Sequence, residues 1–195
     1  LAQLRGNMFA DEIQSVLAEL RHMPEKVQGV IDEEEQVANL ANSMKDSESV
    51  LFLGRHVGFP VALEGALKLK EIAYLHAEGF AAGELKHGPI ALIEEGQPVF
   101  VIVPSPRGRD SLHSKVVSNI QEIRARGAIT IVIAEEGDTA VEDYANHVIR
   151  IPKAPTLMQP LLATVPLQIF AAHVAKSKGY DVDQPRNLAK SVTVE

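Results

Sequence analysis

The stretch "SVLFLG", residues 49–54, decides the fold. It is a short, continuously apolar run that ends in glycine, and three similar runs follow it: "PVFVIVP" (98–104), "AITIVIA" (128–134) and "HVIRIP" (147–152). Segments with helical spacing lie between the first three runs, and a long one, residues 161–179, follows the fourth. Apolar β-branched runs that alternate with helices are typical of parallel strands covered on both faces. We therefore predict an α/β fold, with a doubly wound, mostly parallel sheet flanked by helices.

The segments on either side of this region differ from it. Residues 1–46 are acidic, and their apolar residues recur at helical spacing. Residues 180–195, "YDVDQPRNLAKSVTVE", show neither helical nor strand periodicity. We therefore predict a helical lead-in over 1–46, an α/β domain over 47–179 and a tail over 180–195. Pro166 lies inside the last helical pattern, where we expect it to kink the helix or to mark its start.

Composition limits the function. The 195 residues are 46% hydrophobic and 23% charged, as in a soluble globular domain. The net charge of −7 argues against general binding to nucleic acid or to an anionic membrane, and no apolar run approaches the ~20 residues of a membrane span. The absence of cysteine excludes disulfides and thiolate metal sites, so we expect a cytoplasmic protein. Because the chain starts at Leu1 without a signal peptide, we expect a piece of a longer protein.

A charged stripe follows the first apolar run. In "EGALKLKE" (64–71), Glu64, Lys68 and Glu71 stand at positions i, i+4 and i+7, within roughly 60° of one another on a helix. Apolar residues border this stripe, and Lys70 points elsewhere, where we interpret it as structural. The stripe fits a surface ion pair worth about 0.3–0.5 kcal/mol. It also fits the wall of a site that uses perturbed acids and amines. The pattern alone leaves both interpretations open.

The next segment, "LHAEGFAAGELKHGP" (75–89), adds two glutamates, one lysine and two histidines, including His87. A histidine beside a Gly-Pro turn is more often a polar loop residue than a catalyst. The spacing of these residues matches no zinc-binding helix, so we predict no metal and no cofactor.

Ligands of such sheets lie beyond the carboxyl ends of the strands, so the turns after the four apolar runs are the places to search. After the second run, "PSPRGRDS" (104–111) fits a weak anion site or a solvated loop.

Two segments together resemble one known family. "ALEGALKLKEIAYLHAEGFAAGELKHGPIAL" (62–92) and "DVDQPRNLAKSVTVE" (181–195) closely resemble the C-terminal sugar-isomerase (SIS) domain of the glutamine–fructose-6-phosphate aminotransferase family. The resemblance extends from about Val50 to Glu195, and the tail is its most specific part. It implies a flavodoxin-like SIS fold. It also implies an enzyme that makes glucosamine 6-phosphate from fructose 6-phosphate, with ammonia from a separate glutaminase domain.

The resemblance implies roles for the charged stripe. Glu71 would be the base that moves a proton between C1 and C2 of the sugar, with Glu64 and Lys68 as its partners. His87 would assist ring opening and would reach the site from the neighbouring subunit. The chemistry asks for these residue types, because a ketose–aldose shift needs a carboxylate that takes and returns a carbon-bound proton. Ring opening needs a group that titrates near neutrality.

The resemblance also implies roles for the tail. Lys190 would form a Schiff base with the open-chain ketose, although its position near the chain end would by itself predict a solvated lysine. Arg186, Ala189 and Val192 would belong to a closing tail that shields the site and lines the ammonia path. A tail that closes would exclude water and protect the imine.

The chain also lacks parts of that family. The family's Ser/Thr-rich phosphate loop lies in a first SIS subdomain, and the corresponding turn here, "GRHVGFP", has no hydroxyl, so we predict no phosphate-binding residue. We expect a homodimer whose partners are fructose 6-phosphate or glucosamine 6-phosphate, the first SIS subdomain and the glutaminase domain. We expect little synthase activity from the fragment alone. A non-catalytic sugar-phosphate-binding module of a regulator and a dimerisation scaffold remain the alternatives.

Overall fold

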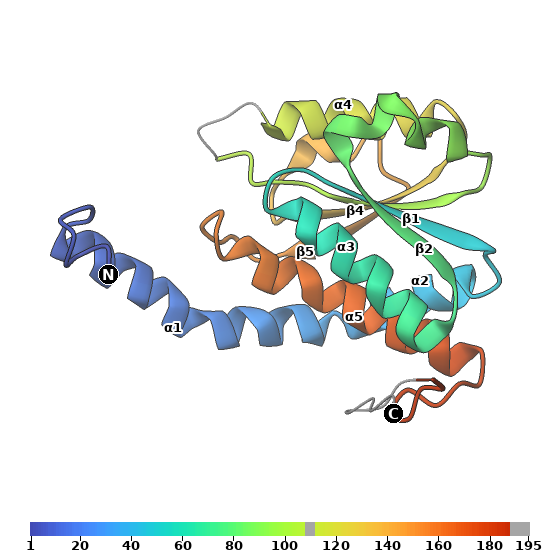
Figure 1. Ribbon diagram of the computed structural model, residues 1–195, viewed down its shortest axis with the longest axis horizontal. Coiled ribbons are helices and arrows are strands. Elements are labelled where there is room, and N and C mark those ends of the chain that lie inside the picture. The colour runs from blue at the N-terminus through green and yellow to red at the C-terminus, as the bar shows by residue number, and fades with distance from the viewer. Residues whose placement is uncertain (108–111, 188–195) are drawn as a thin grey trace, which may run out of the picture.

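Five parallel strands form the centre of the molecule, as the computed structural model shows for residues 1–107 and 112–187 (Figure 1). The strands are β1 (Ser49–Gly54), β2 (His76–Ala81), β3 (Pro98–Ile102), β4 (Ile129–Glu135) and β5 (His147–Ile151). Their order in the sheet is β2-β1-β3-β4-β5, and every neighbouring pair is parallel. This is the order of flavodoxin-like doubly wound sheets. The fold predicted from the apolar runs is confirmed.

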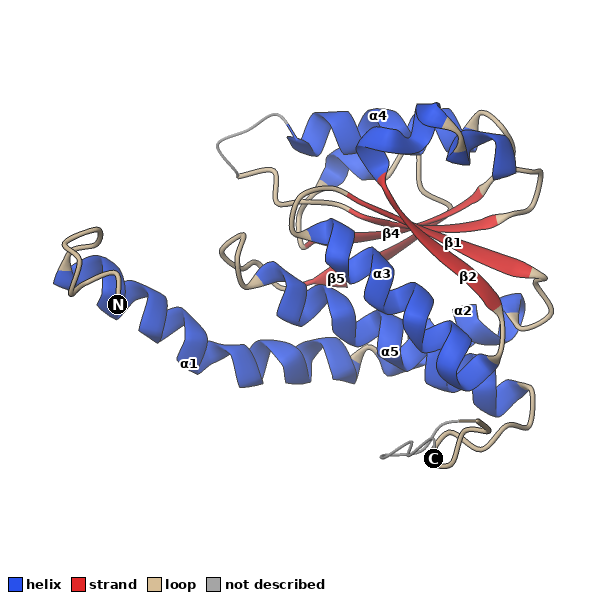
Figure 2. Ribbon diagram, in the orientation of Figure 1, coloured by secondary structure: helices blue, strands red, loops and turns tan. Residues whose placement is uncertain are grey.

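Helices cover both faces of this sheet (Figure 2). The α-helices are α1 (Ala10–Asp32), α2 (Glu34–Met44), α3 (Gly58–Lys68), α4 (Leu112–Arg124) and α5 (Gln159–Ser177). The shorter turns are the π-helical η1 (Leu69–Ala73) and the 3₁₀-helical η2 (Ala82–His87), η3 (Pro89–Leu92) and η4 (Thr139–Val141). α4 lies on one face of the sheet with η2 and η3, and α2, α3 and α5 lie on the other. Within the described residues, no helix has the length and apolarity that a membrane span requires.

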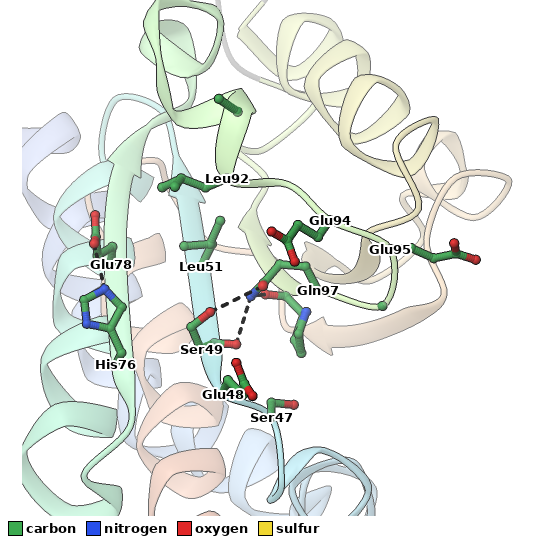
Figure 3. Close-up of a pocket in the computed structure, with 13 residues that line it drawn as sticks. Ser47, Glu48, Ser49, Leu51, His76, Glu78, Leu92, Glu94, Glu95 and Gln97 are labelled. Atoms are coloured by element: carbon green, nitrogen blue, oxygen red, sulfur yellow. Dashed lines mark hydrogen bonds and ion pairs between the residues drawn. The ribbon is translucent and has the colours of Figure 1, made fainter.

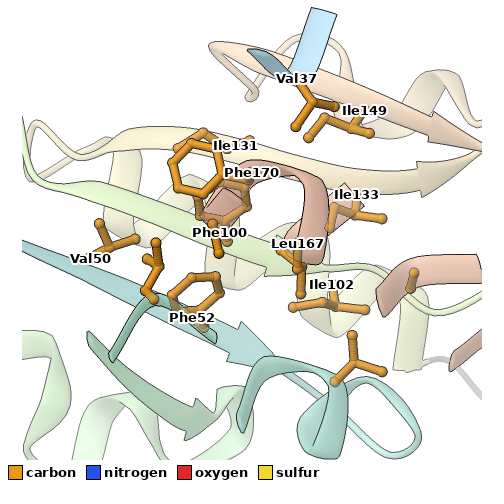
Figure 4. Close-up of a cluster of buried hydrophobic side chains, with 14 of the residues drawn as sticks. Val37, Val50, Phe52, Phe100, Ile102, Ile131, Ile133, Ile149, Leu167 and Phe170 are labelled. Carbon is orange, nitrogen blue, oxygen red and sulfur yellow. The ribbon is translucent and has the colours of Figure 1, made fainter. Parts of the chain in front are cut away.

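Alternation along the strands divides the core in two. Leu51 and Leu53 of β1 face the α4 side, whereas Val50 and Phe52 face the α3 and α5 side. On that second side the ring of Phe52 stacks on the ring of Phe100 of β3, with 5.0 Å between the ring centres. The ring of Phe100 meets that of Phe170 of α5 edge-on, with 4.7 Å between the ring centres (Figure 4). Both faces of the sheet are therefore buried, which explains why its strands read as continuous apolar runs.

The lead-in helices contribute to the same core. Met23 and Val30 of α1, with the inner face of α2, pack in the cluster that contains Phe170. The first half of α1 projects away from the sheet (Figure 1) and leaves Phe9 and Leu20 exposed.

The structure departs from the sequence-based expectations in two places. The strand β2, "HAEGFA", was not predicted, because it lacks β-branched residues and reads as part of a charged loop. Pro166 does not mark the start of a helix, since α5 begins at Gln159 and contains Pro166 in its interior. The four predicted strands occur, with ends that shift by at most two residues.

Candidate active site

A glycine at the end of β1 places the helix that carries the charged stripe. A Cβ atom on Gly54 would lie 2.0 Å from the carbonyl oxygen of Gly58, so the chain turns this tightly only because residue 54 has no side chain. The turn starts α3, which runs back along the sheet. Small residues on its inner face allow close packing, since a Cβ on Gly65 would lie 2.8 Å from both Leu167 and Phe52. The stripe therefore faces outward from a tightly seated helix.

The stripe closes into one ion cluster. The Nζ atom of Lys68 lies 2.5 Å from Oε2 of Glu71 and 3.6 Å from Oε1 of Glu64. These side chains are 27%, 29% and 34% exposed respectively, so each is partly withdrawn from water. The hydrogen bond to Glu71 raises the pKa of Lys68, and the negative charges of Glu64 and Glu71 raise it further against the opposing effect of burial. Lys68 is therefore an ammonium group at neutral pH, placed between two carboxylates.

Glu71 lies in a π-helical turn. η1 continues α3 directly and ends at Tyr74, whose backbone is left-handed at φ 53° and ψ 32°. A positive φ is unusual for a bulky residue and costs on the order of 1–3 kcal/mol. π-helical turns and strained residues of this kind occur frequently at functional sites. Lys70, which we interpret from the sequence as structural, also lines the pocket of Glu71.

The pocket at Glu71 is an open depression of about 500 Å³ between η1 and the start of the tail. Its lining residues are Lys70, Glu71, Tyr74, Leu75, His76, Arg186 and Asn187. The guanidinium carbon of Arg186 lies 4.1 Å from the ring centre of Tyr74, and the Arg186 backbone N–H donates a hydrogen bond of 2.7 Å to the Tyr74 hydroxyl. The structure thus brings the predicted tail residue Arg186 to the pocket of Glu71.

This pocket lies at the amino ends of the strands. η1 directly precedes β2, whose first residue, His76, also lines the pocket. The expectation that a site would lie at the turns beyond the carboxyl ends is therefore wrong for this cluster. α3 runs antiparallel to β1, so the charged residues in its second half lie near the amino ends of the strands.

At the carboxyl ends, the polar groups pair with one another. Ser105 donates a hydrogen bond of 3.0 Å to Glu135, and Arg107 donates to both carboxylate oxygens of Glu135 at 3.1 Å. Glu135 is only 2% exposed and Ser105 is also buried. The start of the loop after β3 is thus neither wholly solvated nor a free anion site, because Glu135 already occupies Ser105 and Arg107.

His87 lies apart from the cluster within one chain. It ends η2, which follows β2, whereas η1 precedes β2, so the full length of that strand separates His87 from Glu71. His87 is exposed, and it does not line the pocket of Glu71. The remaining predicted tail residues, Ala189, Lys190 and Val192, lie outside the residues that the structure describes.

A second depression, of about 420 Å³, lies on the other side of β2 (Figure 3). His76 pairs there with Glu78 at 2.8 Å, and Gln97 donates a hydrogen bond of 2.8 Å to the carbonyl oxygen of Ser49. Glu94 and Glu95 lie on the loop at the opposite rim (Figure 3). No lysine or arginine lines this depression. In the described part of the chain, no three acidic or histidine side chains gather closely enough to hold a metal ion.

Comparison with known proteins identifies the family. The family described as "SIS domain" matches residues 43–177, which include the whole sheet, α3 and η1. The chain belongs to the SIS domain family. The match begins within α2 and ends at the last residue of α5, so all of α1, most of α2 and the tail lie outside it.

Three curated relatives of this SIS domain carry the same name. The glutamine–fructose-6-phosphate aminotransferase (isomerizing) of Corynebacterium glutamicum is 83% identical over all 195 residues of the chain. Those of Corynebacterium diphtheriae and Mycobacterium tuberculosis are 84% and 65% identical, again over the whole chain. The chain spans only 31% of the length of each of these relatives.

Solved structures extend the comparison. The C-terminal domain of glucosamine-fructose-6-phosphate aminotransferase from Francisella tularensis is 37% identical, with a TM-score of 0.85, and covers 94% of this chain. The match spans 50% of that structure. A putative tagatose-6-phosphate ketose/aldose isomerase from Clostridium novyi has a TM-score of 0.81 over 95% of the chain and 50% of its own length. At 17% identity this second likeness concerns the fold alone.

Proposed function

We propose that this SIS domain is the C-terminal isomerase portion of a glutamine–fructose-6-phosphate aminotransferase. In that enzyme it would help to convert fructose 6-phosphate and glutamine-derived ammonia to glucosamine 6-phosphate. The identity of 83% to a relative of that name, over the whole chain, supports this assignment. The observation that carries the chemistry is the partly buried Glu64–Lys68–Glu71 cluster, whose Glu71 borders an open pocket.

The proposed role of Glu71 is to move one proton. With the open-chain sugar held as an imine at C2, the Glu71 carboxylate takes a proton from C1, and the electron pair forms a C1=C2 double bond while the C=N pair moves to nitrogen. Glu71 then returns the proton to C2. The C1 hydroxyl becomes the aldehyde carbonyl, and its proton goes to the nitrogen at C2. Ammonia displaces the Lys190 amine from the imine before this step, so the nitrogen that stays on C2 is that of ammonia. Atoms and electrons balance, and no oxidant or metal is needed.

Lys68 and Glu64 would support this transfer electrostatically. The ammonium group of Lys68 donates a hydrogen bond of 2.5 Å to Glu71 and holds the carboxylate in place. Glu64 contacts the same ammonium group at 3.6 Å and helps to hold it in place. In the proposed site, Lys68 would also donate a hydrogen bond to a sugar oxygen on which negative charge develops.

The remaining roles require parts beyond one described chain. We propose that His87 assists ring opening at the site of a second copy in a homodimer, which fits its separation from Glu71 by the length of β2. Lys190 would form the Schiff base with the ketose, and Ala189 and Val192 would line the closed site with it. Cytoplasmic location belongs to the same proposal.

Two larger partners follow from the same assignment. A first SIS subdomain would supply the phosphate loop, and a glutaminase domain would supply ammonia. The outer face of α3 offers an apolar surface for covering, because Leu63 and Leu67 beside the stripe are 44% and 41% exposed. Electrostatic interactions are stronger where water is excluded. A partner domain that covers this face would therefore strengthen the ion pair between Glu71 and Lys68.

Proton exchange at C1 tests the proposed function. The full-length protein that contains this chain is incubated with fructose 6-phosphate in D₂O, with and without glutamine, and deuterium in the sugar is measured by NMR. Glu71→Gln keeps the size of the side chain but removes the base, so we expect incorporation to fall by on the order of 10²–10⁴-fold. Glu95→Gln, at the separate depression in Figure 3, is the matched control. Unchanged exchange in Glu71→Gln would favour the non-catalytic binding module instead.

A further inference from the structure

Tyr74 joins two segments that are far apart in the sequence. It follows Glu71 by three residues and ends the π-helical turn. Its hydroxyl accepts a hydrogen bond from the backbone N–H of Arg186 at 2.7 Å, and its ring lies under the Arg186 guanidinium at 4.1 Å. The ring of Tyr180 lies on it as well, at 4.9 Å and tilted by 58°. One side chain therefore makes three separate contacts with the segment that follows α5.

The backbone conformation of Tyr74 makes these contacts possible. A residue in the right-handed helical region would continue η1, whereas φ 53° ends the turn and starts the connection to β2. Glycine or asparagine tolerates this conformation at lower cost, yet a tyrosine occupies the position. The strain is thus accepted at a residue whose ring and hydroxyl both have specific partners.

We propose that Tyr74 is a positioning residue, which fixes the start of the C-terminal tail against the turn that carries Glu71. Arg186 and Asn187 line the pocket of Glu71, and they are the last residues that the structure describes. The contact of Arg186 with Tyr74, rather than with the neighbouring Glu71, assigns its guanidinium to anchoring. Tyr74 would thereby hold Arg186 and Asn187 at the rim of this pocket. This inference rests on the proposed function, because it concerns the same site.

Amide hydrogen exchange tests the anchor in the chain itself. Tyr74→Phe removes only the hydroxyl that accepts from Arg186. We expect the exchange rate of the Arg186 amide to rise by about two- to tenfold, the value of one hydrogen bond, while the core amides of β3 and β4 keep theirs. Tyr144→Phe is the matched control, because it makes the same chemical change on the other side of the sheet. Tyr74→Leu also removes the ring and should have a larger effect.

Activity of the full-length protein tests the positioning role. We expect Tyr74→Phe to lower kcat for glucosamine 6-phosphate synthesis by about two- to tenfold, and Tyr74→Leu to lower it further. Hydrolysis of glutamine, which a separate domain would perform, should keep its rate. A merely structural effect would lower both activities together. If Tyr74→Phe keeps at least half of the synthase activity that Tyr74→Leu loses, the contact made by the ring is the part that positions the tail.

The outcomes separate this inference from the function on which it rests. If the wild-type protein makes glucosamine 6-phosphate and Tyr74→Leu keeps full kcat, the positioning role is wrong and the proposed function stands. If Arg186 exchange is the same in wild type, Tyr74→Phe and Tyr74→Leu, the anchor itself is wrong. If the wild-type protein makes no product, the proposed function fails, and the exchange rates still decide whether Tyr74 holds Arg186.

Discussion

The Nζ atom of Lys68 lies 2.5 Å from Oε2 of Glu71, and this contact crosses the junction between an α-helix and a π-helical turn. A surface pair within one regular helix would stabilise it by only a few tenths of a kcal/mol. Here the acidic partner borders a pocket that also contains a residue of the distant tail. The pair thus joins the end of α3 to the pocket that Arg186 also lines.

Removal of the Lys68 charge should affect activity far more than stability. The ion pairs of Lys68 are about one quarter to one third exposed, so we expect Lys68→Met to change the free energy of unfolding by no more than about 1 kcal/mol. Synthase activity should fall by on the order of 10²-fold, because Glu71 loses the ammonium group beside it. Urea denaturation and steady-state kinetics measure the two effects. A parallel loss in both would indicate a structural role.

Exchanging the two charges separates pairing from catalysis. The double variant Glu64→Lys with Lys68→Glu keeps an ion pair at i and i+4 but moves the ammonium group away from Glu71 and puts a carboxylate there. A dimerisation scaffold that only pairs charges should tolerate this exchange. We expect synthase activity to drop at least as far as in Lys68→Met, because like charges at 68 and 71 repel. Retention of activity would support the scaffold.

From neutral pH upward, the stability that Lys68 contributes should change only under alkaline conditions. Its pKa is raised above the ordinary 10.5 by the hydrogen bond to Glu71, so the folded state binds the proton more tightly than the unfolded state. The contribution is fully present below pH 10.5 and is lost as pH rises through the folded value. The difference in unfolding free energy between wild type and Lys68→Met should be constant from pH 7 to 9 and shrink above 10.5. Lys70→Met serves as the control, and a difference that disappears below pH 9 would contradict the assignment.

Mixed dimers test whether His87 acts across subunits. Coexpression of Glu71→Gln with His87→Asn gives heterodimers in which one site has both altered residues and the other has neither. We expect each single variant to be nearly inactive and the mixture to recover about a quarter of wild-type activity, the share from random pairing in a two-fold dimer. Tagged purification of the heterodimer checks the pairing. No recovery would place His87 in its own chain's site or outside catalysis.

Glycine substitutions test the packing that seats α3. Gly54→Ala would put a Cβ atom 2.0 Å from a backbone oxygen, so we expect destabilisation of about 3 kcal/mol or more. Gly29→Ala, in α1, meets nothing within 4 Å and should stabilise the chain by up to about 1 kcal/mol through helix propensity. Thermal denaturation compares the two variants. Equal effects would mean that the β1 turn relaxes more easily than its geometry indicates.

The sequence predicted the fold well where side-chain chemistry repeats. The four strands with β-branched apolar runs are confirmed because burial on both faces requires such runs. β2 was missed because "HAEGFA" is an edge strand with mostly small and polar residues, which local preference does not mark as a strand. Its pairing with Val50 and its neighbours in β1 forms it, and that is a tertiary effect.

The candidate site was predictable only in part. The spacing of Glu64, Lys68 and Glu71 gave the cluster, because i, i+3 and i+4 neighbours meet on a helix. The sequence did not indicate that a π-helical turn begins at residue 69 or that Lys70 lines a pocket with Glu71. No residue pattern indicated the left-handed backbone of Tyr74 or the contact of its side chain with the distant Arg186.

The sequence-based interpretation of the turn after β3 was incomplete for a different reason. Ser105 and Arg107 have the chemistry of an anion site, but the sequence does not show that Glu135, some 30 residues later, reaches them. A buried carboxylate needs compensating donors, and these two residues provide them. Glu135 reaches Ser105 and Arg107 because β3 and β4 are neighbours in the sheet, and the sequence does not show which strands are neighbours.

The contact between Tyr74 and Tyr180 gives the molecule a built-in optical signal. The chain contains three tyrosines and no tryptophan, so its near-ultraviolet absorption above 275 nm belongs to tyrosine alone. Two of the three chromophores lie 4.9 Å apart at a fixed tilt of 58°, close enough for their transitions to couple. Circular dichroism in this band therefore reports mainly on the junction between the π-helical turn and the tail, without any label.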